Sequence, residues 1–154
     1  MEKAITTALL VIASIVAAVA LMNAVYPAVT RGTGAILESS GAAAARVRTE
    51  VDIVFASGDT SNNKITFWAK NVGTQVVQAV EKSDLFVTTP TTVKRIPYNS
   101  GAEYWTYSLE DSATAWSQTK TVKIVVTMTS VTAGLYKVQL IVPNGVQAEK
   151  QFSV

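Results

Sequence analysis

The sequence predicts an α+β protein in which a long hydrophobic N-terminal helix is followed by an immunoglobulin-like antiparallel β-sandwich. Three observations support this fold class: residues 4–30 carry no charge, residues 31–50 remain rich in alanine, and residues 51–154 alternate apolar with polar side chains. The chain of 154 residues leaves room for one domain of ordinary size and an appendage. We therefore expect a helix and stalk over residues 1–50 and a sandwich over residues 51–154.

The first segment is long enough to cross a membrane. Its apolar run from residue 4 to residue 26 exceeds the roughly 20 residues that a helix needs to span the hydrocarbon core. A secretory signal has a shorter apolar core of about 7 to 15 residues behind several positive charges, whereas only Glu2 and Lys3 precede this run. We expect the segment to be retained as a transmembrane or filament-core helix rather than removed.

Small side chains are frequent inside this segment. Such residues let helices approach closely, in lipid or in a helical bundle. We therefore predict that six of them are membrane or helix-packing residues: Ala8, Ala13, Ser14, Ala17, Ala20 and Ala24. The alternative is an ordinary alanine-rich span. Self-association is one function that this face would serve.

The stalk continues the helical composition beyond the apolar run. Gly32, Gly34 and Gly41 interrupt it, and we expect a kink near Gly41. A helix from about residue 4 to about residue 48 would be roughly 65 to 70 Å long at 1.5 Å per residue. It would hold the following domain away from the bilayer.

From residue 51 the hydrophobic period changes from helical to alternating, as in half-buried strands. Turn residues such as Pro143-Asn144-Gly145 separate the alternating runs. The expected strands are 52–56, 65–70, 85–88, 92–96, 104–108, 122–128, 136–142 and 148–154. Short strands without intervening helices indicate a sandwich, with a small barrel as the alternative. Strand 136–142 or 148–154 would offer a partner a pairing edge if it lies at one.

The composition excludes most enzymes. The chain contains no cysteine and no histidine, so it lacks thiolate nucleophiles, Cys/His zinc ligands and the usual neutral-pH base. The net charge of only +2 argues against a nucleic-acid partner. We expect no catalytic residue, cofactor, metal or small-molecule substrate.

Three aromatic residues are candidates for a partner surface: Trp105, Tyr107 and Trp116. Tryptophan and tyrosine are enriched at interface hot spots. Trp105 and Trp116 have polar neighbours in sequence, so we expect both to be exposed. The alternative is that they fill the core of the sandwich.

The chain resembles the archaellum family, the archaeal motility filament and its accessory components, most of all the FlaG and FlaF accessory group. Three segments carry the resemblance: Ile5-Thr6-Thr7-Ala8-Leu9-Leu10-Val11-Ile12-Ala13-Ser14-Ile15-Val16-Ala17-Ala18, Val47-Arg48-Thr49-Glu50-Val51-Asp52-Ile53, and Thr66-Phe67-Trp68-Ala69-Lys70-Asn71-Val72-Gly73-Thr74. The resemblance implies a stator protein anchored in the cell membrane, with its sandwich in the extracellular pseudoperiplasm. Its implied partners are the surface-layer protein, archaellum components and further copies of itself.

Within the same family, an archaellin that polymerises into the extracellular filament is the main alternative. Archaellins are made with a basic leader that is cut after a glycine, and Met1-Glu2-Lys3 departs from that pattern. The chain also has no Asn-x-Ser/Thr acceptor site, which archaellins often carry. Both features favour the accessory role. A surface adhesin or solute-binding module on a stalk is a third possibility.

Overall fold

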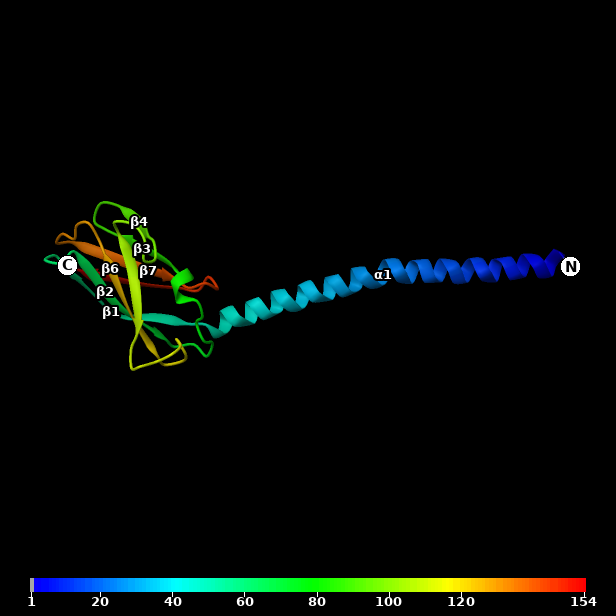
Figure 1. Cartoon of the computed structure of the whole chain (residues 1–154), viewed down its shortest axis with the longest axis horizontal. Coiled ribbons are helices and arrows are strands. Elements are labelled where there is room, and N and C mark those ends of the chain that lie inside the picture. Colours follow the sequence, from blue (N-terminus) through cyan, green and yellow to red (C-terminus); the bar gives the residue numbers. More distant parts are fainter. Residues whose placement is uncertain (1) are drawn as a thin grey trace. The chain divides into compact units, whose positions relative to one another are not determined.

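The computed structural model describes residues 2–154, which form one long helix, α1 (Glu2–Arg48), and eight strands (Figure 1). The strands are β1 (Val51–Asp59), β2 (Lys64–Asn71), β3 (Asp84–Thr88), β4 (Val93–Ile96), β5 (Tyr104–Leu109), β6 (Thr121–Thr127), β7 (Leu135–Ile141) and β8 (Gln147–Ser153). A 3₁₀ turn, η1 (Val80–Lys82), precedes β3. The chain divides into two compact units, residues 1–42 and 43–154. The predicted α+β fold is confirmed, and each expected strand is found within one residue of its predicted bounds, except that β1 continues three residues beyond its predicted end.

Helix α1 forms without interruption through Pro27, Gly32, Gly34 and Gly41. Alanine and leucine favour helix strongly enough to offset the isolated glycines. Arg46 and Arg48 lie in the last turn, where positive charge complements the helix dipole.

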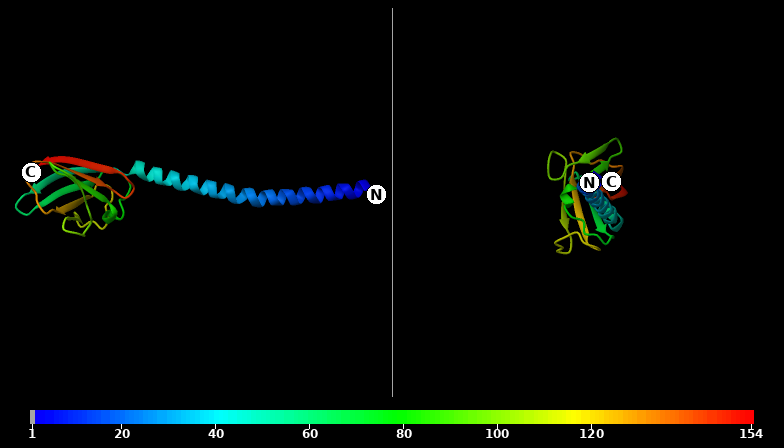
Figure 2. Two further views of the ribbon diagram at one scale, coloured as in Figure 1. Left: turned by 90° about the horizontal axis from the view of Figure 1, so that it is seen from above. Right: turned by 90° about the vertical axis from the view of Figure 1, so that its right-hand side faces the viewer.

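The strands form two antiparallel sheets, each of four strands among the described residues, ordered β1-β2-β6-β5 and β4-β3-β7-β8. Figure 2 shows the two sheets as stacked layers. The register follows the hydrophobic pattern: Phe67 pairs with Ile124 and Ala69 with Val122, so apolar residues share the inner face. Of the two strands considered for partner pairing, β8 lies at a sheet edge, whereas β7 lies between β3 and β8.

The core lies between the sheets and takes every second residue from the inner strands β2, β3, β6 and β7 and fewer residues from the edge strands. Its largest members are fully buried: Trp105, Trp116, Tyr136, Phe67, Ile53, Ile65, Leu85, Ile96, Ile124 and Leu140. At one side of the sandwich, edge strand β1 packs against edge strand β8. Gly58 in β1 permits this approach, because a Cβ there would overlap the side chain of Val154.

The expectation that Trp105 and Trp116 are exposed is wrong: they are 0% and 1% exposed. Trp105 is on the inner face of β5, and its polar neighbours in sequence point to the outer face because strand side chains alternate. Its ring lies 4.9 Å from the ring of Tyr98 in an edge-to-face arrangement. Trp116 lies outside the named strands and donates its Nε1–H to the carbonyl of Lys120 at 3.0 Å. Polar neighbours in sequence therefore do not indicate that a residue of a strand is exposed, because adjacent residues face opposite sides of the sheet.

Replacing Trp105 with alanine should lower the free energy of unfolding by about 3–5 kcal/mol, because it leaves a large cavity in a fully buried position. Trp105→Phe should cost much less, since Trp105 Nε1 has no hydrogen-bond partner among residues 2–154 and its loss removes an unpaired donor. Chemical denaturation followed by circular dichroism measures both. Equal stability of Trp105→Ala and the natural protein would place this side chain outside the core.

Candidate functional site

The apolar part of α1 has no partner within the described chain. An 18-residue window has a mean hydropathy of 2.6 and is 0% buried, and the helix is long and apolar enough to cross a membrane. Ile5, Leu10 and Leu21 are each at least 61% exposed. Burying a side chain of this size away from water is worth about 1.5–3 kcal/mol. The helix therefore requires lipid or other helices around it.

Six of the serine and threonine hydroxyl groups in the helix donate to carbonyls of the preceding turn. Ser14 Oγ donates to the carbonyl of Val11 at 2.8 Å, and Thr7 Oγ1 donates to the carbonyl of Lys3 at 2.7 Å. Thr6, Thr30, Thr33 and Ser39 make equivalent bonds to the preceding turn. An unpaired polar group in hydrocarbon costs several kcal/mol, of the order of 4–8 for a hydroxyl or amide. These bonds make the serine and threonine side chains compatible with an apolar environment.

The six predicted packing residues do not all share one face. Ala13, Ala17, Ala20 and Ala24 follow one another at helical spacing and form a single small face. Ala8 and Ser14 lie on other sides of the helix by the same periodicity. The small face is thus carried by four alanines, and its role in packing stays a prediction.

Backbone hydrogen bonds join the end of α1 to the turn that follows β2. The carbonyl of Arg48 accepts from the amides of Thr74 at 2.9 Å and Gln75 at 3.1 Å. The carbonyl of Glu50 accepts from Val72 and Gly73 at 2.9 and 3.0 Å. The last carbonyls of a helix lack partners within it, so a neighbouring turn can satisfy them. Gly73 is required here, since a Cβ would overlap the backbone of Arg48 and Glu50.

Asn71 organises this turn. Its Nδ2 donates to the carbonyls of Gln75 at 2.8 Å and Trp116 at 3.0 Å, while its Oδ1 accepts from the amide of Gly73 at 3.0 Å. The residue is 0% exposed. Because every polar atom of the amide has a partner, the buried side chain stabilises the turn.

A second turn holds the same helix end. Thr49 Oγ1 donates to the carbonyl of Ala45 at 2.8 Å and accepts from Asn144 Nδ2 at 2.6 Å. Gly145 leaves room for the guanidinium of Arg46, which a Cβ would approach to 2.5 Å. Residues 43–50 are therefore fixed to the sandwich by the turns at Asn71–Gln75 and Pro143–Gly145.

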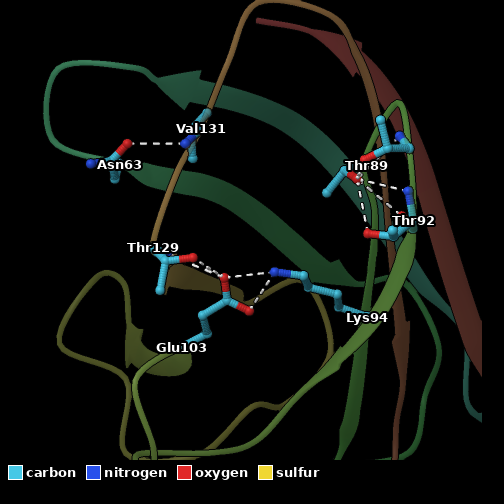
Figure 3. Close-up of polar contacts among 8 residues, drawn as sticks. Asn63, Thr89, Thr92, Lys94, Glu103, Thr129 and Val131 are labelled. Carbon is cyan, nitrogen blue, oxygen red and sulfur yellow. Dashed lines mark hydrogen bonds and ion pairs between the residues drawn. The ribbon is translucent and has the colours of Figure 1, made fainter.

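A cleft of about 410 Å³ lies at the opposite end of the sandwich from the helix attachment. Hydroxyl side chains dominate its lining, which comprises Thr89, Pro90, Thr91, Thr92, Lys94, Met128, Thr129, Ser130, Thr132 and Tyr136. Figure 3 shows Glu103 between Lys94 and Thr129 beside this cleft. The Glu103 carboxylate accepts from Lys94 Nζ at 2.9 Å and from Thr129 Oγ1 at 2.7 Å. These bonds hold the pKa of Glu103 below its usual range.

The loops around the cleft are ordered by their own side chains (Figure 3). Asn63 Oδ1 accepts from the amide of Val131 at 3.0 Å, and Thr89 Oγ1 accepts from the amide of Thr92 at 3.0 Å. Within residues 2–154 no group of three or more histidine, cysteine, aspartate or glutamate side chains is placed to hold a metal ion. The cleft offers hydroxyl donors and acceptors on fixed loops, which suits binding through hydrogen bonds.

Three aromatic residues were predicted to form a partner surface, and two of them, Tyr107 and Trp116, lie at the same groove. Both line a groove of about 350 Å³ whose other wall is the segment Val76–Val80. Tyr107 is half-buried, and burial raises the pKa of its hydroxyl, with a further contribution from the Glu81 charge. Trp105 does not line this groove.

Sequence reasoning missed Asn71 and Glu103. The turn at residues 71–73 contacts the helix end through residues 48–50, which lie more than twenty positions away in the sequence. Glu103, Lys94 and Thr129 come from separate segments of the chain, so no local pattern marks them.

A model of the archaeal-type flagellin family matches residues 2–152. An uncharacterized protein of Archaeoglobus fulgidus is 28% identical over 159 residues, which cover 99% of this chain and 98% of that protein. The archaellum periplasmic stator protein FlaG from Sulfolobus acidocaldarius has a TM-score of 0.59 at 24% identity, covering 68% of this chain and 99% of that one. The stator complex of FlaF and FlaG from the same organism matches with a TM-score of 0.59 at 23% identity, covering 68% and 89%. The structural matches show a shared fold.

Asn71→Ala should lower the free energy of unfolding by about 2–4 kcal/mol, because it removes three hydrogen bonds made by a fully buried side chain. The matched control is Asn62→Ala, an exposed asparagine bound to exposed Asp59, which should cost less than about 0.5 kcal/mol. Denaturant titration of the three proteins measures the difference. Equal effects of the two substitutions would contradict the role given to Asn71.

The interaction of Glu103 should make stability depend on pH. Because the folded pKa of Glu103 is lowered, its contribution is present at neutral pH and is lost as the pH falls through that pKa. The stability difference between the natural protein and Glu103→Gln should therefore shrink as the pH is lowered below about 4.3, the ordinary glutamate pKa. Glu149→Gln, which removes the more exposed pair with Lys137, is the control and should show little effect. A pH-independent difference for Glu103→Gln would refute the assignment.

Proposed function

The chain belongs to the archaeal-type flagellin family, and from this premise we propose that it is a membrane-anchored accessory protein of the archaellum that acts as a stator. In this proposal the helical part, residues 1–50, is the anchor and stalk, and the sandwich, residues 51–154, is the binding domain. The sandwich lies on the extracellular side of the membrane and binds the surface-layer protein, other archaellum components or further copies of this chain. The protein has a structural role and no enzymatic one.

The observation that carries this proposal is that an apolar, membrane-length helix and a sandwich of the FlaG type occur in one chain. Both matched structures are named as periplasmic stator proteins of the archaellum, and this chain shares their fold. A stator has to transmit load between the membrane and whatever its outer domain binds. Within residues 43–154, the bonds from Arg48 and Glu50 to the turn at residues 72–75 hold the last turn of the helix to the sandwich.

The cleft lined by Thr89–Thr92 and Met128–Ser130 is a polar surface that an outer partner could bind. It lies at the end of the sandwich that is remote from residues 43–50, so a partner bound there would not contact the helix attachment. Its threonine and serine hydroxyls fit a partner that presents amides or hydroxyls. Peptide loops and glycans of a surface layer both have this chemistry.

The second candidate is an archaellin-like subunit that polymerises into an extracellular filament. The name of the matched family and the alanine face at residues 13, 17, 20 and 24 favour it. In this role the helix would leave the lipid and pack against other helices. The same fold serves both functions, so location in the cell has to separate them.

We expect the protein to stay in washed membranes and to be absent from sheared extracellular filaments. Cells that express the full chain are sheared, their membranes are washed, and both fractions are analysed by mass spectrometry that includes the N-terminal peptide. Enrichment in the filament fraction would establish the alternative, with residues 4–26 as filament core.

Ile15→Arg should reduce the membrane-bound fraction, since an arginine at the centre of a span costs about 2.5–3.5 kcal/mol. Ile36→Arg is the matched control, because residue 36 lies beyond the apolar run. Fractionation of both variants gives the readout. Loss of membrane binding in both variants, or in neither, would argue against an anchor confined to residues 4–26.

A further inference from the structure

We propose that two copies of this chain pair through strand β5, edge to edge and antiparallel, so that their β1-β2-β6-β5 sheets join into one continuous sheet. This inference deepens the proposed function, because it names the strand through which the sandwich self-associates. It rests on the backbone groups that β5 leaves unpaired and on the charges of the sheet edges.

On the side away from β6, the second half of strand β5 has backbone groups without hydrogen-bond partners in the described part of the chain. The backbone amide and carbonyl of Trp105 point away from β6. The amide donates to the carbonyl of Pro97 at 3.0 Å, and the carbonyl accepts from the amide of Asn99 at 2.9 Å. Backbone groups alternate along a strand, so Tyr107 and Leu109 also point away from β6. No hydrogen bond to these two amides or carbonyls is made within residues 2–154. The edge therefore presents two donors and two acceptors in a row.

The other sheet edges carry the protection that is usual for exposed strands. Strand β1 contains a bulge between Ile53 and Phe55, and it packs against β8. Strand β4 is only four residues long and includes Lys94 and Arg95. Strand β8 carries Glu149 and Lys150. Strand β5 has no charged residue, no proline and an unbroken register with β6.

The absence of charge on β5 favours a second copy as the occupant. A two-fold symmetric contact is made by the same patch on both chains, so it places each residue near its own equivalent. Like charges directly opposite one another destabilise a strand pair. Pairing of β5 with itself avoids this cost.

The occupied half of β5 determines the register. Since the outward groups of Trp105 are already bonded, the outward groups of Tyr107 and Leu109 have to bond with each other across the symmetry axis. Tyr107 of each copy then pairs with Leu109 of the other copy. Each of these two pairs makes two backbone hydrogen bonds, which gives four in total. Ser108 lies on the axis opposite Ser108 of the second copy, in a non-hydrogen-bonded pair with a Cα separation of about 4.5 Å.

The chain offers a direct test because it contains no cysteine. The full chain carrying Ser108→Cys, purified in detergent and mildly oxidised, should form a disulfide-linked dimer, since the expected separation falls within the disulfide range of about 4.4–6.8 Å. Ser57→Cys, on the outer face of β1 in the same sheet, is the matched control and should remain unlinked. Non-reducing electrophoresis should show at least a tenfold difference in dimer yield.

A second pair of variants tests the backbone bonds. Adding Leu109→Pro to Ser108→Cys removes the outward amide and should reduce the linked dimer at least tenfold, whereas adding Leu109→Val keeps the amide and should preserve it. Circular dichroism confirms that the double variants remain folded. The proposal is overturned by an unlinked Ser108→Cys protein, by equal linking of Ser57→Cys, or by unchanged linking in a folded Leu109→Pro variant. These outcomes are measured on purified protein, so they are independent of whether the chain proves to be a membrane stator in the cell.

Discussion

The buried amide of Asn71 is the interaction on which the attachment of the helix depends. It ends β2, closes the turn at Gly73 and reaches the loop at Trp116, and each of its polar atoms has a partner. The turn that it shapes presents four amides to the carbonyls of Arg48 and Glu50. A buried polar network of this kind is stable only when it is complete. One side chain in the middle of the sequence therefore shapes one of the two turns that hold the helix end.

The functional surfaces of the sandwich are separated by its architecture. Antiparallel strands bring the helix end, the Asn71 turn and the Pro143–Gly145 turn to one end, and the β3–β4 and β6–β7 loops to the other. Strand β5 leaves an open edge at the side, next to the groove of Tyr107 and Trp116. The helix end, the cleft and the open edge of β5 thus lie on separate parts of one domain, so the proposed partner and the proposed second copy would not compete.

Much of the fold was predictable because it depends on local patterns. Alternation at Phe67, Val126 and Val138 identifies strands and their inner faces, and the long uncharged run identifies the helix. The candidate site was harder to predict from the sequence. Trp105 was misjudged because its neighbours in sequence lie on the opposite face of the sheet. Glu103 and Asn71 act on residues that only the sheet topology brings near them, and the open edge of β5 depends on how residues 97–99 fold back. The family resemblance, confirmed by the match over residues 2–152, supplied the functional context that these patterns lack.

The packing of β1 against β8 has a consequence for how the protein is made. It joins the first strand after the helix to the last strand of the chain, and Val154 fills the space that Gly58 leaves open. Contacts between such distant parts of a sequence slow folding, because a long loop has to close before they form. The sandwich cannot be completed until its final strand has been synthesised. The apolar helix precedes the sandwich in the chain, so it is synthesised before the sandwich can complete its fold.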